Sequence, residues 1–160
     1  MRILVLSDSH DSYRLLLKAI ENEKEKGFEA LVFLGDGESD YDIVTRNLSG
    51  ISTYRVRGNN DWGSSIALSA AVEIGSHKYL LCHGHTFGVR MGTETLENTA
   101  RQNGCHVALF GHTHCRHYSF SSGIHIFNPG SVALPRDGMG KSYGIITEEN
   151  GKLDFFWENL

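Results

Sequence analysis

Five short polar clusters divide this chain, and each follows an apolar run of the kind that forms a β-strand. The apolar runs lie at residues 3–6, 30–34, 53–56, 78–82 and 107–110. The clusters that follow them are Asp8-Ser9-His10, Gly35-Asp36-Gly37, Gly58-Asn59-Asn60-Asp61, His83-Gly84-His85 and Gly111-His112-Thr113-His114. In α/β folds, loops at the carboxyl ends of neighbouring strands gather at one edge and build binding sites. We therefore predict that the five clusters form one site.

Strands and helices alternate in the first two thirds of the chain, and strands alone fill the last third. We predict helices at residues 12–26, 41–47 and 93–103. Further strands, joined by Gly-containing turns, are predicted at residues 118–120, 124–128, 142–147 and 153–157. This order predicts an α/β fold of two packed β-sheets with helices outside them. The length of 160 residues predicts a single domain over residues 1–160.

Net charge, hydropathy and cysteine spacing indicate which partners and which cellular location to expect. The formal net charge is −4, so the bulk basic surface of a nucleic-acid-binding protein is missing and nucleic acid is not an expected partner. The N-terminal residues lack the apolar core of a signal peptide, and no stretch approaches the roughly 20 apolar residues that span a bilayer. We expect a cytoplasmic protein without membrane contact. The three cysteines show no C-x-x-C spacing and predict no disulfide framework.

Carboxylate and imidazole groups dominate the clusters, and they are the ligands of hydrolytic metal sites. Taken singly, Asp8 can be a turn or cap residue, Asp36 a turn residue between glycines, and the Asn59 segment a loop. The histidines are more specific, because four of the nine stand in H-x-H pairs at 83–85 and 112–114. In an extended segment, residues i and i+2 point to the same side, so each pair can present two imidazoles to one site. The histidines without such a partner are expected on the surface or in packing: His77, His106, His117 and His125.

The set of clusters resembles the calcineurin-like metallophosphoesterases, whose pattern is D-x-H, G-D-x, G-N-[HCN]-[DE], H-G-[HG] and G-H-x-H. The resemblance covers residues 4–135 and includes the segment Asn128-Pro129-Gly130-Ser131. Length and spacing look most like the small single-domain phosphodiesterase branch, which includes bacterial and archaeal phosphodiesterases and the eukaryotic retromer subunit. The resemblance implies a four-layer α-β-β-α sandwich, with two packed β-sheets flanked by helices.

The resemblance also implies a phosphodiesterase in which a hydroxide between two divalent metals attacks a small phosphate ester in line. One metal would be held by Asp8, His10 and His114, with Asp36 as the bridge to the second. The second metal would also be held by Asn59, His83 and His112. Manganese is the first expectation, and iron, zinc or nickel suit the same mixed ligands. The state of oligomerisation stays open, including a homo-oligomer.

The position of the expected general acid departs from the family pattern. Many relatives carry a histidine that protonates the leaving group where this chain has Asn60, and an amide is no acid near neutral pH. His85 is the alternative donor by sequence, although it can equally be a hydrogen-bond partner of the site, and metal-bound water is a third source. We list His85 and Asn60 as the candidate catalytic positions.

Two other functions are weighed against the enzyme. A non-catalytic metal-binding scaffold or protein-interaction module on the same fold is the main alternative, but it has no evident need for a complete ligand set. A DNA nuclease is disfavoured by the acidic balance of charge.

Overall fold

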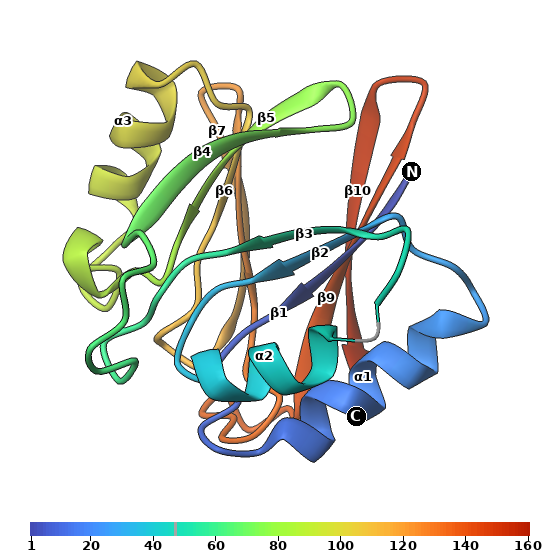
Figure 1. The fold of residues 1–160 in the computed structure, drawn as a ribbon. Helices are drawn as coiled ribbons and strands as arrows, with labels where there is room; N and C mark the ends of the chain where they lie inside the picture. The colour runs from blue at the N-terminus through green and yellow to red at the C-terminus, as the bar shows by residue number, and fades with distance from the viewer. Residues whose placement is uncertain (47) are drawn as a thin grey trace.

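A computed structural model describes residues 1–46 and 48–160, and in this part of the chain ten strands form two five-stranded sheets (Figure 1). The first sheet has three parallel strands on one side and two C-terminal strands on the other. The two C-terminal strands pair antiparallel with each other, and one of them pairs antiparallel with the N-terminal strand. The parallel strands are β1 (Arg2–Leu6), β2 (Ala30–Phe33) and β3 (Ser52–Arg55), and the pair is β9 (Ser142–Glu149) and β10 (Lys152–Asn159). The strand order is β10-β9-β1-β2-β3.

The second sheet also has three parallel strands at its centre, with one antiparallel strand on each edge. The central strands are β5 (His77–Cys82), β6 (Val107–Leu109) and β8 (Ile124–Pro129), and the edges are β4 (Ser69–Ile74) and β7 (Arg116–Ser121). Helices α1 (Tyr13–Lys24) and α2 (Glu38–Thr45) cover the first sheet, and α3 (Glu94–Gln102) covers the second (Figure 1). A short 3₁₀ turn, η1 (His85–Phe87), follows β5.

Alternation of side chains along the strands fills three apolar layers. In β1, Ile3 and Val5 face the layer between the two sheets, whereas Leu4 and Leu6 face the layer beneath α1 and α2. A third layer packs Leu96 of α3 against the second sheet. All five of these side chains are buried, at roughly 1.5–3 kcal/mol each by transfer free energies. The prediction of two packed sheets flanked by helices is confirmed.

Two elements differ from the prediction. Strand β4 was not predicted, because its burial alternates and its first residues are the small, weakly strand-forming Ser69, Ala70 and Ala71. Helix α2 starts at Glu38, three residues before the predicted start, and its predicted end at residue 47 lies outside the described residues. No helix in the described part of the chain is both long and apolar enough to cross a membrane.

The parallel arrangement positions the polar clusters. Strands β1, β2 and β3 run side by side in one direction, as do β5, β6 and β8 in the other sheet. Their carboxyl ends therefore lead into loops at one edge of each sheet, and every one of the five clusters lies in such a loop.

Candidate metal centre

Four of the five clusters bring potential metal ligands within reach of one another. Asp8, His10 and His114 form one group, and Asp8, Asp36 and His83 form another that shares Asp8. Within each group the ligand atoms lie within 4.8 Å of one another. These loops follow β1, β2, β5 and β6, so the centre joins both sheets.

Asp8 lies at the middle of this cluster and is fully buried. Its Oδ2 accepts hydrogen bonds from the Ser7 hydroxyl at 2.6 Å and from the His112 backbone N–H at 3.1 Å. Its Oδ1 has no hydrogen-bond donor among the described residues and lies 3.1 Å from His114 Nε2. A buried carboxylate oxygen without a donor is costly, so this atom is suited to a cation.

Two of the histidines are held in a single tautomer by backbone carbonyl groups. His83 Nδ1 lies 2.7 Å from the Leu34 carbonyl oxygen, and His114 Nδ1 lies 2.7 Å from that of Leu134. A carbonyl oxygen only accepts, so Nδ1 carries a proton in both rings, and Nε2 is the atom that presents a lone pair when the ring is neutral. Burial acts to lower the pKa of His83, but contact with Asp36 and the charges of Asp8 and Asp36 raise it, so a cation would bind there in exchange for the Nε2 proton. His83 Nε2 is buried without a partner in the described chain and lies 3.4 Å from Asp36 Oδ2. Lone pairs that converge on carboxylate oxygens fit a cation placed between them, and the donor set therefore suits a divalent metal.

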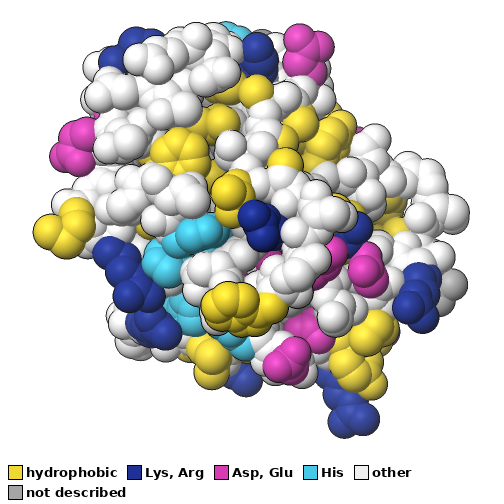
Figure 2. Space-filling view, turned by 60° about the vertical axis from the view of Figure 1, so that its left-hand side comes forward, with side chains coloured by type: hydrophobic (Ala, Val, Ile, Leu, Met, Phe, Trp, Pro, Cys, Tyr) yellow, Lys and Arg dark blue, Asp and Glu magenta, His cyan; other side chains and the backbone are white. Residues whose placement is uncertain are grey.

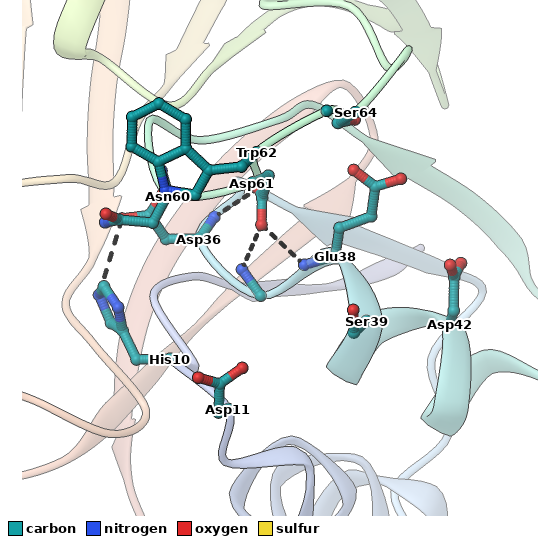
Figure 3. A pocket seen from close by; sticks show the side chains of 12 residues that line it. His10, Asp11, Asp36, Glu38, Ser39, Asp42, Asn60, Asp61, Trp62 and Ser64 are labelled. Atoms are coloured by element: carbon teal, nitrogen blue, oxygen red, sulfur yellow. Dashed lines mark hydrogen bonds and ion pairs between the residues drawn. The ribbon is translucent and has the colours of Figure 1, made fainter.

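Asp36 is held by the loop that contains the third cluster. Its Oδ1 accepts from the Asn60 backbone N–H at 2.8 Å, and its Oδ2 accepts from the Asn60 side-chain amide at 2.6 Å. His10 Nε2 lies 3.7 Å from Asp36 Oδ2, and Figure 3 shows these side chains pointing toward each other. Burial acts to raise the pKa of Asp36, but hydrogen bonds and charge from His83 and Asn60 outweigh it and hold the pKa far below the usual range. Asp36 is thus an anion at all ordinary pH values.

His112 and His85 surround His83. The ring centroids of His112 and His85 lie 5.1 Å and 5.5 Å from that of His83. Burial, together with the charge of His83, lowers the pKa of His112 to about 4. Burial and His83 also lower the pKa of His85, whose Nδ1 is buried without a partner in the described chain. Both rings are therefore neutral near pH 7, and neutral imidazole is the form that binds metals.

The third cluster approaches the centre through its backbone. A Cβ atom added at Gly58 would collide with the Asp36 carboxylate, so only glycine allows the two loops this close contact. Asn59 follows on this loop, and its side chain is exposed. Asn59 therefore lies on the loop that contacts Asp36, next to the two groups of ligand atoms but not within them.

Comparison with known proteins agrees with this geometry. Residues 1–151 match the calcineurin-like phosphoesterase superfamily domain. The chain belongs to this superfamily. Its family places it among the phosphoesterases, and the resemblance drawn from the motifs is confirmed.

Similar proteins extend over nearly the whole of this phosphoesterase. A probable metallophosphoesterase of Bacillus subtilis, YsnB, is 31% identical over 150 residues, which cover 94% of this chain and 86% of the relative. Phosphodiesterase YfcE of Escherichia coli strain K12 is 28% identical over 170 residues, covering 93% and 89% of the two chains. The structure of wild-type Vps29 complexed with zinc, from Entamoeba histolytica, has a TM-score of 0.76 at 20% identity and covers 99% of this chain and 98% of its own. That last similarity shows the shared fold.

Asp61 is a site residue of this phosphoesterase to which sequence reasoning gave no role. Its carboxylate accepts four backbone hydrogen bonds, from Asp36 at 2.9 Å, Gly37 at 2.8 Å, Glu38 at 2.9 Å and Gly58 at 2.7 Å. Figure 3 shows the carboxylate directed at the backbone of the Asp36 loop. It thereby joins two clusters and caps the start of α2. The signal in the sequence is the acidic residue that closes the G-N-x-[DE] pattern.

The backbone of the ligand loops differs from the extended form predicted for the H-x-H pairs. His112 and His114 have φ angles of 65° and 59°, and Gly84 between the other pair has a φ of 113°. The prediction of extended pairs is wrong, because the loops turn sharply at the strand ends and still bring the imidazoles together. Asp8 and Asp36 share this left-handed conformation, which costs of order 1 kcal/mol per non-glycine residue.

Hydrogen bonds from distant segments hold these strained loops. The Asn128 amide donates to the Gly111 carbonyl at 2.9 Å and to the Thr113 hydroxyl at 3.1 Å. The Ser131 hydroxyl donates to the Asp8 carbonyl at 2.8 Å. The Asn128-Pro129-Gly130-Ser131 segment, a part of the family resemblance, therefore positions the metal-ligand loops.

Proposed function

We propose that this chain is a cytoplasmic, metal-dependent phosphodiesterase that binds two divalent cations and hydrolyses small phosphate esters. The observation that supports it most directly is the convergence of three atoms: Asp8 Oδ1 and His83 Nε2 have no hydrogen-bond partner in the described chain and lie 3.8 Å apart, and His114 Nε2 lies 3.1 Å from the same Asp8 oxygen. When bound, a pair of divalent cations supplies positive charge for the phosphoryl oxygens and a water of lowered pKa as nucleophile. The whole chain would act as one domain.

The residues divide between the two proposed metal positions. Asp8, His10 and His114 would hold the first cation, because their ligand atoms form one compact group. Asp36 would touch both cations, since its Oδ2 lies 3.7 Å from His10 Nε2 and 3.4 Å from His83 Nε2. The remaining ligands of the second cation would be His83, His112 and Asn59.

A cavity beside the centre has room for one side of a small ester. It measures about 430 Å³ and includes His10, Asp36, Asn60 and Trp62 in its lining. Figure 3 shows the Trp62 ring over the cavity, and its side chain is 88% exposed. An exposed indole ring next to a reacting phosphate is suited to contact an apolar or aromatic ester group.

The leaving group receives weak proton assistance in this proposal. The Asn60 amide is bound to Asp36 and has no acidic proton. His85 is the remaining imidazole for this role, and its lowered pKa leaves little imidazolium at neutral pH. Asn60 is thus proposed as a positioning residue for Asp36, and His85 as a weak acid.

The proposed function is tested by metal titration and activity on the same samples. After chelation, loading with manganese, zinc or nickel is expected to reach about two equivalents per chain and to restore hydrolysis of bis(p-nitrophenyl) phosphate, with manganese most active. The diester should be cleaved faster than p-nitrophenyl phosphate. Zero occupancy by elemental analysis would reject the metal centre, and full occupancy without turnover on any ester would favour the scaffold.

A steep dependence of rate on leaving-group pKa is expected. A stable aryloxide departs with little help, whereas an alkoxide needs a proton in the transition state. A series of substituted aryl methyl phosphates, extended to alkyl diesters, measures the slope. Asn60→His should flatten it if the new imidazole reaches the departing oxygen, and Asn60→Ala is the control that loses the bond to Asp36 without gaining an acid. A shallow slope in the parent protein would show that His85 or water already supplies the proton.

A further inference from the structure

A second cavity opens beside the metal centre, on the side of the fourth and fifth clusters. It has a volume of about 730 Å³. Thr113, which stands between the proposed ligands His112 and His114, is part of its lining. The other lining residues that matter here are Val89, Arg90, Met91, Phe110 and Arg136. The cavity therefore borders the loop that carries two of the proposed metal ligands.

The cavity has an apolar floor. Val89 and Phe110 are 7% and 2% exposed and belong to the core layer beneath α3. Met91 is 94% exposed at the cavity, so its flexible side chain is free to cover an apolar group. This floor can bury part of a ligand without leaving polar groups unpaired.

Two arginine side chains at the rim of this cavity have no bonding partner among the described residues. The Arg90 and Arg136 side chains are exposed and form no ion pair or hydrogen bond within the described part of the chain. Arg116, by contrast, donates to the Met139 and Gly140 carbonyl groups and to Asn159. The described lining of this cavity contains three arginines and one carboxylate, that of Glu94, so its charge is positive.

Both arginines line the cavity beside the metal-ligand loop, and Arg136 is bonded to it. The Arg136 backbone N–H donates to the His114 carbonyl at 2.9 Å, and the neighbouring Leu134 carbonyl accepts from His114 Nδ1 at 2.7 Å. Arg90 lines the same cavity as Thr113, which stands between His112 and His114. Figure 2 shows Lys and Arg side chains directly beside the exposed histidines. A group bound by the arginines would thus lie next to the reacting centre.

The cavity on the other side of the centre has the opposite character. Its lining includes Asp11, Glu38, Asp42 and Asp61 and no lysine or arginine among the described residues. A phosphodiester with one anionic arm would therefore be oriented by charge, with that arm on the arginine side. Guanidinium groups bind phosphate oxygens in paired hydrogen bonds, which gives such a subsite both affinity and direction.

We infer that Arg90 and Arg136 form a subsite for a second phosphate group carried on one arm of the phosphodiester substrate, with Met91 and Phe110 contacting the apolar part of that arm. The inference rests on the proposed phosphodiesterase activity. It makes the preferred substrate a diester with an additional phosphate, rather than one with two neutral arms.

A matched pair of substrates tests the subsite. Thymidine 5′-(p-nitrophenyl phosphate) with and without a 3′-phosphate has the same leaving group and the same reacting ester. The 3′-phosphate is expected to lower KM by about tenfold with little change in kcat, because the added contact binds ground state and transition state alike. Arg90→Gln and Arg136→Gln should each remove most of this preference and leave KM for the unphosphorylated ester within about twofold. Lys152→Gln, which removes the same charge at a 77% exposed residue of the β9–β10 hairpin, should keep the preference.

The outcomes separate the subsite from the activity. Turnover of both esters with equal KM, or an unchanged preference in the arginine variants, would overturn the subsite and leave the phosphodiesterase intact. Absence of turnover on either ester would overturn the proposed activity instead. In that event, calorimetric titration decides the subsite: thymidine 3′,5′-bisphosphate should bind about tenfold more tightly than thymidine 5′-monophosphate, and only in proteins that keep both arginines. Equal affinities would overturn it.

Discussion

Replacing Asp36 with asparagine is expected to reduce turnover far more than replacing His85 with alanine. Asp36 Oδ2 faces both His10 and His83, so its charge serves both proposed cations. Both Asp36 oxygens also accept hydrogen bonds from Asn60, and an asparagine at 36 would have to turn its own NH₂ group toward a donor. The loss should exceed the roughly 10²–10⁴-fold effect typical of a lost general acid, whereas His85→Ala should stay within or below that range.

The comparison needs saturating metal and one substrate of fixed leaving group, with kcat and metal content measured on the same samples. Asp154→Asn is the matched control, because it removes one carboxylate charge at an exposed residue of β10 that is paired with Lys152 and lines neither cavity. The control should retain parental kcat. An Asp36→Asn protein with near-parental turnover and both metals bound would rule out the bridging role.

The layers of this fold were predictable because they depend on local patterns. Four of the five apolar runs that precede a polar cluster became largely buried parallel strands, since alternate side chains of such a strand serve two apolar layers. Strand β3 is the exception, because it lies at the edge of the first sheet and its residues are half-buried or exposed. Strand β4 was not predicted because an edge strand with alternating burial needs few apolar residues. Its extended conformation is stabilised by backbone pairing with β5. Pairing partners of this kind are not encoded in the segment itself.

The ligand residues were likewise predictable by type, but their conformation was not. The left-handed φ angles of Asp8, Asp36, His112 and His114 are unfavourable for the residues themselves. They persist because Ser131 and other groups far along the chain bond to these loops. A single cluster carries no information about such partners, so its residues predicted a metal site while its local pattern predicted the wrong backbone.

The Asp36 loop depends most strongly on a distant residue, Asp61, whose carboxylate accepts four backbone hydrogen bonds. Replacing Asp61 should cause the largest loss of stability at the site. Asparagine keeps the shape of the side chain but offers one oxygen and one NH₂ group to four backbone N–H donors. Each Asp61 oxygen accepts two of the four bonds, so two backbone donors would then face an NH₂ group instead of an acceptor, and the negative charge at the start of α2 would be lost. Removing a charged acceptor from partly buried donors costs about 1–3 kcal/mol per bond, so a total near 3 kcal/mol is expected.

Urea unfolding of Asp61→Asn in the presence of a chelator measures this loss without a contribution from metal binding. Asp154→Asn again serves as the control, and as an exposed ion-pair change it should alter the free energy of unfolding by less than about 1 kcal/mol. The metal affinity of Asp61→Asn should fall as well, because the loop that holds Asp36 loses its attachment to the Gly58 loop. If the chelated variant unfolds at the parental urea concentration, the four hydrogen bonds do not support the loop. Asp61 would then have to act on the site through its charge, and a normal stability combined with weakened metal binding would identify that case.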